Sequence, residues 1–101
     1  IIWYQKTIQY EPTNANAYYK MGLIYQEQRR YPEAERHFKK AVELKPDDAD
    51  FKTELGNVYV SQRMFPAAIT VFNDSLRLKP TSAAAQLGMG NAYYNDKRFA
   101  E

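Results

Sequence analysis

The chain has 101 residues, of which 45% are hydrophobic, 26% charged and 15% aromatic, and its formal net charge is +2. This length allows one compact domain or a short array of repeats, and the composition excludes an intrinsically disordered chain. The nearly balanced charge provides no strong positive field, so a nucleic-acid partner is not favoured.

Similar residues recur every 34 positions along the whole sequence. Prolines, glycines and aromatic residues recur at this step: Pro12, Pro46 and Pro80; Gly22, Gly56 and Gly90; Tyr25, Tyr59 and Tyr93; Tyr31, Phe65 and Phe99. A fixed period of this length is typical of an array in which each repeat forms one supersecondary unit.

Residues 1–11 are predicted to form the second helix of a partial repeat. When the sequence is shifted by one period, residues in this segment match the later helix: Trp3, Tyr4, Thr7, Ile8 and Tyr10 correspond to His37, Phe38, Ala41, Val42 and Leu44. Because the frame begins inside a unit and the first residue is isoleucine, we expect the chain to be a piece of a longer array.

Residues 15–48 are predicted to form a complete repeat of two helices. Apolar residues recur at three- and four-residue steps from Ala15 to Gln28 and again from Pro32 to Leu44, as on one side of a helix. Asn14 can accept a hydrogen bond at the start of the first helix, whereas Pro32 suits the start of the second. Neither segment has the strict alternation of a strand.

Residues 49–82 repeat this pattern as a second complete unit, with Asp48 as the predicted cap, Pro66 at the second helix start and Pro80 after its end. Residues 83–101 then form a partial repeat, its first helix running from Ala83 to Asp96 after Ser82. Phe99 is predicted to begin the next helix.

A glycine in the middle of each first helix costs roughly 1 kcal/mol relative to alanine, so its recurrence requires a local reason. We expect Gly22, Gly56 and Gly90 to allow close approach of the second helix. Ala34 and Ala68 are the predicted small residues opposite them.

The residues that recur at this 34-residue period resemble the motifs of the tetratricopeptide repeat family over essentially the whole chain. The family's leading motif appears as Tyr18…Met21-Gly22…Tyr25, Leu55-Gly56…Tyr59 and Met89-Gly90…Tyr93, and its later motif as Ala34…Phe38…Pro46 and Ala68…Phe72…Pro80. Lys52 and Gln86 depart from the aromatic column. The resemblance implies an all-α fold, a right-handed α-solenoid of antiparallel helix pairs with about six helices.

The resemblance also implies a protein-protein interaction module, with the first helices lining a concave groove that binds a peptide or helix of a partner. Asparagines in one column, which can both donate to and accept from a peptide backbone, are the favoured residues. The predicted groove residues are Tyr19, Lys20, Leu23, Thr53, Glu54, Asn57, Val60, Asn91, Tyr94 and Asn95. The apolar members could equally pack between adjacent units.

Two further surfaces follow from the sequence. The family's clamp for a terminal carboxylate is not expected, since Thr53, Glu54, Leu87 and Gly88 occupy its polar or basic columns. Arg29, Arg63 and Lys97 stand where the family often has glycine, and could form a basic ridge or simply be solvated turn residues. A non-glycine residue there would be mildly strained if the turn needs a left-handed conformation.

Catalytic, cofactor and metal sites are not predicted, so we expect no enzyme. The sequence contains no cysteine and only one histidine, His37, which is interpreted as a surface or boundary residue. No apolar run approaches the roughly 18 residues of a membrane span, and the chain is expected to be soluble. The alternative function is a self-associating scaffold, a homo-oligomer whose uncapped terminal helices pack end to end between copies.

Overall fold

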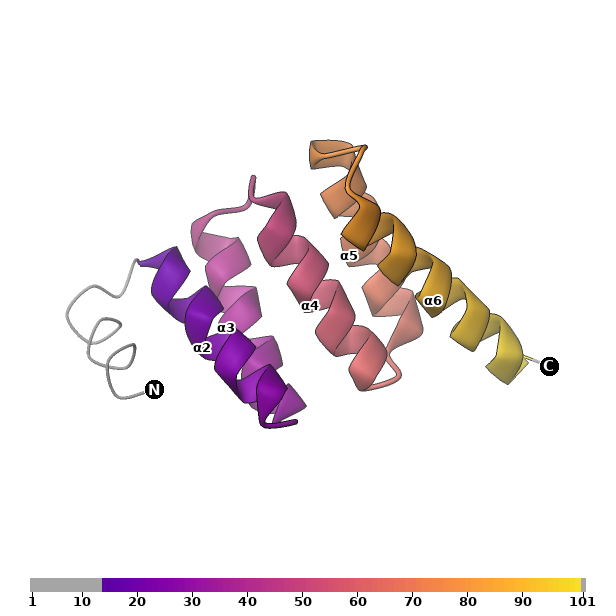
Figure 1. The fold of residues 1–101 in the computed structure, drawn as a ribbon, viewed down its shortest axis with the longest axis horizontal. Helices are drawn as coiled ribbons and strands as arrows, with labels where there is room; N and C mark the ends of the chain where they lie inside the picture. The colour runs from indigo at the N-terminus through magenta and orange to yellow at the C-terminus, as the bar shows by residue number, and fades with distance from the viewer. Residues whose placement is uncertain (1–13, 101) are drawn as a thin grey trace. The chain divides into compact units, whose positions relative to one another are not determined.

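The structure is a computed structural model that describes residues 14–100, with side chains described for residues 14–95. This part of the chain contains helices only, in the order α2 (Ala15–Glu27), α3 (Tyr31–Leu44), α4 (Ala49–Ser61), α5 (Phe65–Leu78) and α6 (Ala83–Ala100), as Figure 1 shows. The all-α prediction is therefore confirmed. The predicted helix over residues 1–11 lies outside the described residues.

The chain divides into two compact units, residues 1–47 and residues 48–101. In the first unit α2 and α3 pack against each other as a helix pair, joined by a short turn. In the second unit α4 and α5 form the same kind of pair, and α6 packs against both of them. Figure 1 shows α5 behind α4 and α6, so the two first helices of this unit share one side.

The predicted caps form at the starts of the first helices. Asn14 and Asp48 accept hydrogen bonds from the backbone N–H groups of Ala17 and Phe51, each at 3.1 Å. The Ser82 hydroxyl accepts one from Ala85 N–H at 3.2 Å. These bonds satisfy donors that have no partner inside the helix, which explains why the three positions share this side-chain type.

The second helices also begin and end as predicted. Both α3 and α5 have a proline in their first turn, where the missing N–H group costs no hydrogen bond. They end at Leu44 and Leu78, shortly before Pro46 and Pro80. Because a residue preceding proline is disfavoured in helical conformation, these prolines stop the second helices.

Gly22 and Gly56 allow close packing as expected, but the side chains nearest to them are phenylalanines and not the predicted alanines. The same prediction for Gly90 was wrong: a Cβ there would meet no atom within 4 Å, and Gly88 is the glycine of α6 that lies against the Phe72 ring. A Cβ on Gly22 would lie 2.6 Å from Cε1 of Phe38, and one on Gly56 would lie 2.6 Å from Cε1 of Phe72. Both phenylalanine side chains are completely buried. The alanine prediction was wrong because a flat ring, stacked on bare backbone, fills the space that glycine leaves.

The third repeat differs from the prediction at its end. Helix α6 continues to Ala100, so Lys97 lies within a helix and not at a turn, and Phe99 does not begin a new helix. In the two preceding repeats, the turn is followed by a helix that packs back on the first one.

Candidate functional site

The exposed side shared by α4 and α6 holds the two asparagines singled out from the sequence. Asn57 is half-buried on α4, and Asn91 is exposed at the equivalent position of α6. Within the described residues neither side-chain amide makes a hydrogen bond, whereas both backbone carbonyls accept one, from Ser61 at 3.2 Å and from Asn95 at 2.8 Å. Each amide therefore keeps a donor and an acceptor for a ligand.

We call this region the α4–α6 surface and define it by the predicted residues that remain at least partly accessible on these helices: Glu54, Asn57, Val60, Asn91, Tyr94 and Asn95. Tyr94 is 70% exposed and gives the surface a large apolar group with a polar tip. The Asn95 side chain already donates one hydrogen bond, to the Asn91 carbonyl, so it has less capacity left for a ligand.

Thr53, which the sequence placed in the groove, is buried inside the α4–α5 pair and is only 4% exposed. Its hydroxyl donates to the Ala49 carbonyl at 3.0 Å and lies 2.7 Å from the Ser75 hydroxyl, which itself donates to the same carbonyl at 2.9 Å. This network satisfies two buried hydroxyl groups between the helices. Thr53 is thus unavailable to a ligand.

The groove residues predicted in the first unit lie on α2. The Tyr19 ring packs against Phe38, with 5.8 Å between ring centroids, so much of this side chain belongs to the helix interface. Lys20 is exposed, and its ammonium group lies 5.9 Å from the centre of the Tyr19 ring. Leu23 is half-buried. Lys20 is therefore the group of this set most open to a ligand.

Glu54 provides the main electrostatic feature of the α4–α6 surface. Burial raises the pKa of its carboxyl above the ordinary value of 4.5, and the negative charge of Asp50 one helical turn away raises it further. Desolvation and a like charge both disfavour the ionised form. The surface around these two carboxyl groups favours a positively charged ligand group.

The turns within the complete repeats confirm the prediction of backbone strain. Arg29 and Arg63 have φ angles of 60° and 62°, in the left-handed region. Around Arg29, the Arg30 N–H donates to the Tyr25 carbonyl at 2.8 Å, and the Arg29 N–H donates to the Gln26 carbonyl at 3.0 Å. This hydrogen-bond pattern is a helix C-terminal motif that usually places glycine at the left-handed residue.

Arg29 and Arg63 are both exposed at these turns, one in each unit. Lys97 belongs to helix α6 instead, so it does not share their turn geometry. A basic ridge formed by these residues stays a prediction.

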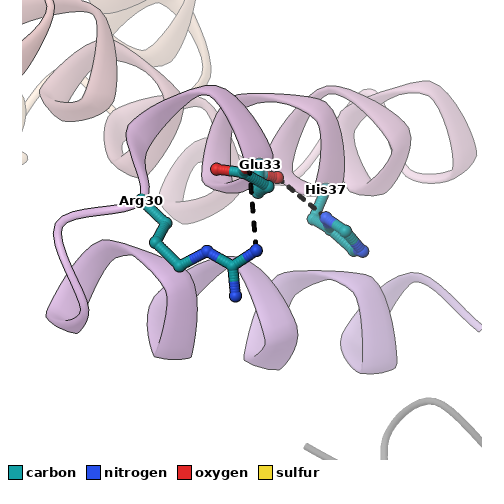
Figure 2. A network of polar contacts seen from close by, with 3 residues as sticks. All are labelled: Arg30, Glu33 and His37. Atoms are coloured by element: carbon teal, nitrogen blue, oxygen red, sulfur yellow. Dashed lines mark hydrogen bonds and ion pairs between the residues drawn. The ribbon is translucent and has the colours of Figure 1, made fainter.

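A polar and aromatic cluster surrounds His37 at the interface of α2 and α3 (Figure 2). His37 Nδ1 lies 2.8 Å from the Glu33 carbonyl and donates to it, because a carbonyl oxygen can only accept. The imidazole packs against the rings of Tyr25 and Tyr18, with centroid distances of 5.0 Å and 6.1 Å. His37 is a boundary residue as predicted, but the sequence did not indicate this ring packing.

Arg30 completes the cluster. Its guanidinium group lies 4.9 Å from the centre of the Tyr25 ring and forms a long ion pair, 3.9 Å, with the Glu33 carboxylate. Figure 2 shows Glu33 between Arg30 and His37, both of which extend toward α2. The equivalent positions in the second repeat are Met64 and Val71. Of the two complete repeats, only the first therefore has this cluster.

The helix pairs, their caps and the glycine columns have direct counterparts in a known family. The family described as Tetratricopeptide repeat matches residues 15–48, and that described as TPR repeat matches residues 56–97. The chain belongs to the tetratricopeptide repeat family. Tetratricopeptide repeats are generally protein-interaction modules and are not catalytic in themselves. None of the curated proteins matches this chain.

A solved structure of a mutant O-GlcNAc transferase from Thermobaculum terrenum is similar to this tetratricopeptide repeat chain. The TM-score is 0.83, the sequence identity is 30%, and the similarity covers 88% of this chain. The match spans only 17% of that protein. It therefore supports the helical-repeat fold and does not transfer the activity of the larger protein.

Among residues 14–95, no group of three or more histidine, cysteine, aspartate or glutamate side chains could hold a metal ion. None of the helices described combines the length and apolar character needed to cross a membrane. The α4–α6 surface is therefore the candidate site for which the structure offers the most specific chemistry.

Proposed function

We propose that this tetratricopeptide repeat chain binds an extended segment of a partner protein across the α4–α6 surface. The observation that carries the proposal is the pair Asn57 and Asn91, at equivalent positions of two adjacent helices, whose amides make no hydrogen bond within the described residues. An asparagine amide can donate to a peptide carbonyl and accept from a peptide N–H group. Two such amides can therefore bind the backbone of one extended peptide at two points and fix its position on the surface.

The spacing of the helices suits an extended ligand. Packed helices lie about 8–10 Å apart, and an extended chain rises about 3.3 Å per residue. A peptide crossing α4 and α6 would thus present backbone groups about three residues apart to Asn57 and Asn91. A helical ligand, which rises only about 1.5 Å per residue and uses its backbone groups internally, would not satisfy both amides.

The side chains around the asparagines indicate what such a peptide would carry. Val60 and Tyr94 offer apolar contact on either helix. The carboxyl groups of Glu54 and Asp50 favour a basic residue, since a positive charge would offset the cost of ionising Glu54 in a partly buried place. The proposed ligand is therefore an extended segment with apolar residues and at least one lysine or arginine.

A peptide selected from a random library against the folded chain tests this function. Asn57→Ala and Asn91→Ala should each weaken its binding about tenfold, the effect of losing a well-formed hydrogen-bonding group. Asn73→Ala is the matched control, because Asn73 is exposed on α5, away from this surface. Fluorescence anisotropy with a labelled peptide measures the affinities. Equal binding by the chain and both asparagine variants would refute the assignment.

The self-associating scaffold, in which terminal helices pack end to end between copies, stays a prediction.

A further inference from the structure

The ring of Phe72, on α5, lies against the backbones of two other helices. A Cβ on Gly56 of α4 would lie 2.6 Å from Cε1 of this ring, and a Cβ on Gly88 of α6 would lie 2.6 Å from the same atom. Phe72 is completely buried, and Gly88 is buried as well. Because real Cβ atoms do not approach another atom so closely, both contacts require glycine. The helices α4 and α6 thus pack on one shared ring.

Gly88 stands where the two preceding repeats have a charged side chain. The residues 34 and 68 positions earlier are Glu54 and Lys20. Glycine inside a helix is unfavourable relative to alanine, so a glycine found in one repeat alone at this position requires a local reason. The Phe72 ring provides that reason, because a side chain at position 88 would keep α6 further from α5.

Both ring contacts lie close to the asparagines of the α4–α6 surface. Gly56 immediately precedes Asn57, and Gly88 lies three residues, slightly less than one helical turn, before Asn91. A shift of α6 relative to the ring therefore moves the backbone that carries Asn91, whereas Asn57 stays with α4.

A methyl group at position 88 would force such a shift. The distance from the new Cβ to Cε1 of Phe72 would have to grow from 2.6 Å to at least 3.4 Å, where ordinary van der Waals contact begins. The ring cannot retreat toward α4, because the Gly56 backbone lies against the same Cε1 and Cζ atoms. Packed interiors have few voids to receive the ring elsewhere. Helix α6 must therefore move outward.

We infer that Phe72 and Gly88 are positioning residues for peptide binding, because their contact holds α6 at the distance from α4 at which Asn57 and Asn91 bind one extended backbone. The inference rests on the proposed function. Both residues are buried, so they act on the ligand through the position of Asn91. Hydrogen bonds span only about 2.7–3.2 Å, so a shift of close to 1 Å breaks one of the two anchoring interactions.

Gly88→Ala tests the inference, with the selected peptide as ligand and fluorescence anisotropy as the measurement. In the unmodified chain, Asn91→Ala should weaken binding about tenfold. In a Gly88→Ala background, Asn91→Ala should weaken binding less than about twofold, because the displaced amide no longer bonds the peptide. A chain that is merely less stable would bind more weakly in proportion and keep the tenfold effect. A tenfold effect in both backgrounds would overturn the inference.

The same measurements separate this inference from the proposed function. If neither Asn57→Ala nor Asn91→Ala weakens binding by the unmodified chain, the proposed function fails and the inference fails with it. If both weaken binding, and Gly88→Ala leaves the effect of Asn91→Ala intact, the inference alone fails.

Gly90→Ala is the matched control, the same substitution two residues further along α6. A Cβ there would meet no atom within 4 Å, so the substitution gives α6 no reason to move. Peptide affinity and the effect of Asn91→Ala should match those of the unmodified chain. A loss of binding as large as that in Gly88→Ala would mean that the Phe72 contact is not what positions Asn91.

A second substitution restores space beside the new methyl group. Phe72→Leu shortens the side chain that this group meets, so the double variant Gly88→Ala, Phe72→Leu should let α6 return toward α5. It should bind the peptide at least about threefold more tightly than Gly88→Ala alone and recover the sensitivity to Asn91→Ala. This comparison holds even where Gly88→Ala alone disrupts α6, which circular dichroism would detect. Binding by the double variant no tighter than by Gly88→Ala would overturn the inference.

Discussion

The ring of Phe38 lies directly on the backbone of Gly22, so close that a Cβ at this glycine would be 2.6 Å from Cε1 of the ring. Phe38 is completely buried, and its ring is held between the two helices of the first complete repeat. Real side chains do not approach so closely, so the contact exists only because residue 22 is glycine. The helix propensity lost at this position is the cost of that packing.

Gly22→Ala should therefore lower the free energy of unfolding, although alanine is the better helix former. The added methyl group would force the Phe38 ring to move in a packed interface, which costs about 1–3 kcal/mol. Chemical denaturation followed by circular dichroism measures the change. An increase in stability would contradict the contact.

Gly90→Ala is the internal comparison for that prediction. With no atom within 4 Å of the new Cβ, the substitution should gain the helix propensity alone, up to about 1 kcal/mol. Alanine should therefore lower the free energy of unfolding at position 22 and raise it at position 90, although both positions hold the same glycine of the repeat. If Gly22→Ala and Gly90→Ala changed the free energy of unfolding in the same direction, the Phe38 contact would not determine the effect at Gly22.

The strained turn leads to a stabilising substitution. Arg29 has a φ of 60°, which costs a residue with a Cβ roughly 1–2 kcal/mol, whereas glycine adopts it freely. Arg29→Gly should raise the free energy of unfolding by up to about 1 kcal/mol, because added freedom in the unfolded chain offsets part of the relief. Thermal denaturation should show a higher midpoint for the variant.

Arg30→Gly is the matched control, one residue further along the same turn. Arg30 has a φ of −96° and packs its guanidinium over the Tyr25 ring, so glycine gains nothing there and loses this contact. The variant should be less stable than the unmodified chain. If Arg29→Gly were also destabilising, the left-handed conformation would not carry the strain assigned to it.

The repeat period made most of the local structure predictable. Caps such as Asn14 and Asp48, the early prolines of α3 and α5, and the left-handed turn at Arg29 follow from backbone requirements that single residue types satisfy. Such requirements act over a few residues, so they can be read from sequence. The contacts between helices could not be read in the same way.

Thr53 and the glycine columns show why. The sequence gives the direction of a side chain around its own helix, but not which group of the facing helix reaches it. Thr53 was placed in the groove because it lies on the side of the first helix opposite the predicted buried stripe, yet Ser75 and the Ala49 carbonyl satisfy its hydroxyl in the interior. Likewise, Phe38 and not Ala34 proved to face Gly22.

The buried hydroxyl network predicts energetic coupling between two helices. Thr53→Val removes the hydroxyl with little change in volume and should cost about 0.5–1.5 kcal/mol. Ser75→Ala should cost a similar amount, because the Ser75 hydroxyl lies within hydrogen-bond distance of both the Thr53 hydroxyl and the Ala49 carbonyl, and the two hydroxyl protons are shared among these contacts. Once one hydroxyl is gone, the second mutation breaks fewer bonds, so the double variant should lose less than the sum. Additive losses in urea denaturation would contradict the network.

Glu54 predicts a stability difference that depends on pH. Burial, and then the charge of Asp50, raise its pKa in the folded chain above the ordinary value of 4.5, so the folded state holds the proton more tightly than the unfolded state. Above its folded-state pKa the group is ionised, and this ionised form destabilises the fold. This penalty disappears as the pH falls through the folded-state pKa, and none remains below the unfolded-state value.

Glu54→Gln should therefore raise the midpoint of thermal denaturation at pH 7, and the advantage should shrink on acidification and vanish below about pH 4.5. Glu43→Gln on α3 is the control, because the Glu43 side chain is 71% exposed and its ion pair with Lys40 is long, at 3.9 Å. That variant should show no comparable gain at pH 7. A midpoint for Glu54→Gln at or below that of the unmodified chain at pH 7 would mean that burial does not penalise the Glu54 charge.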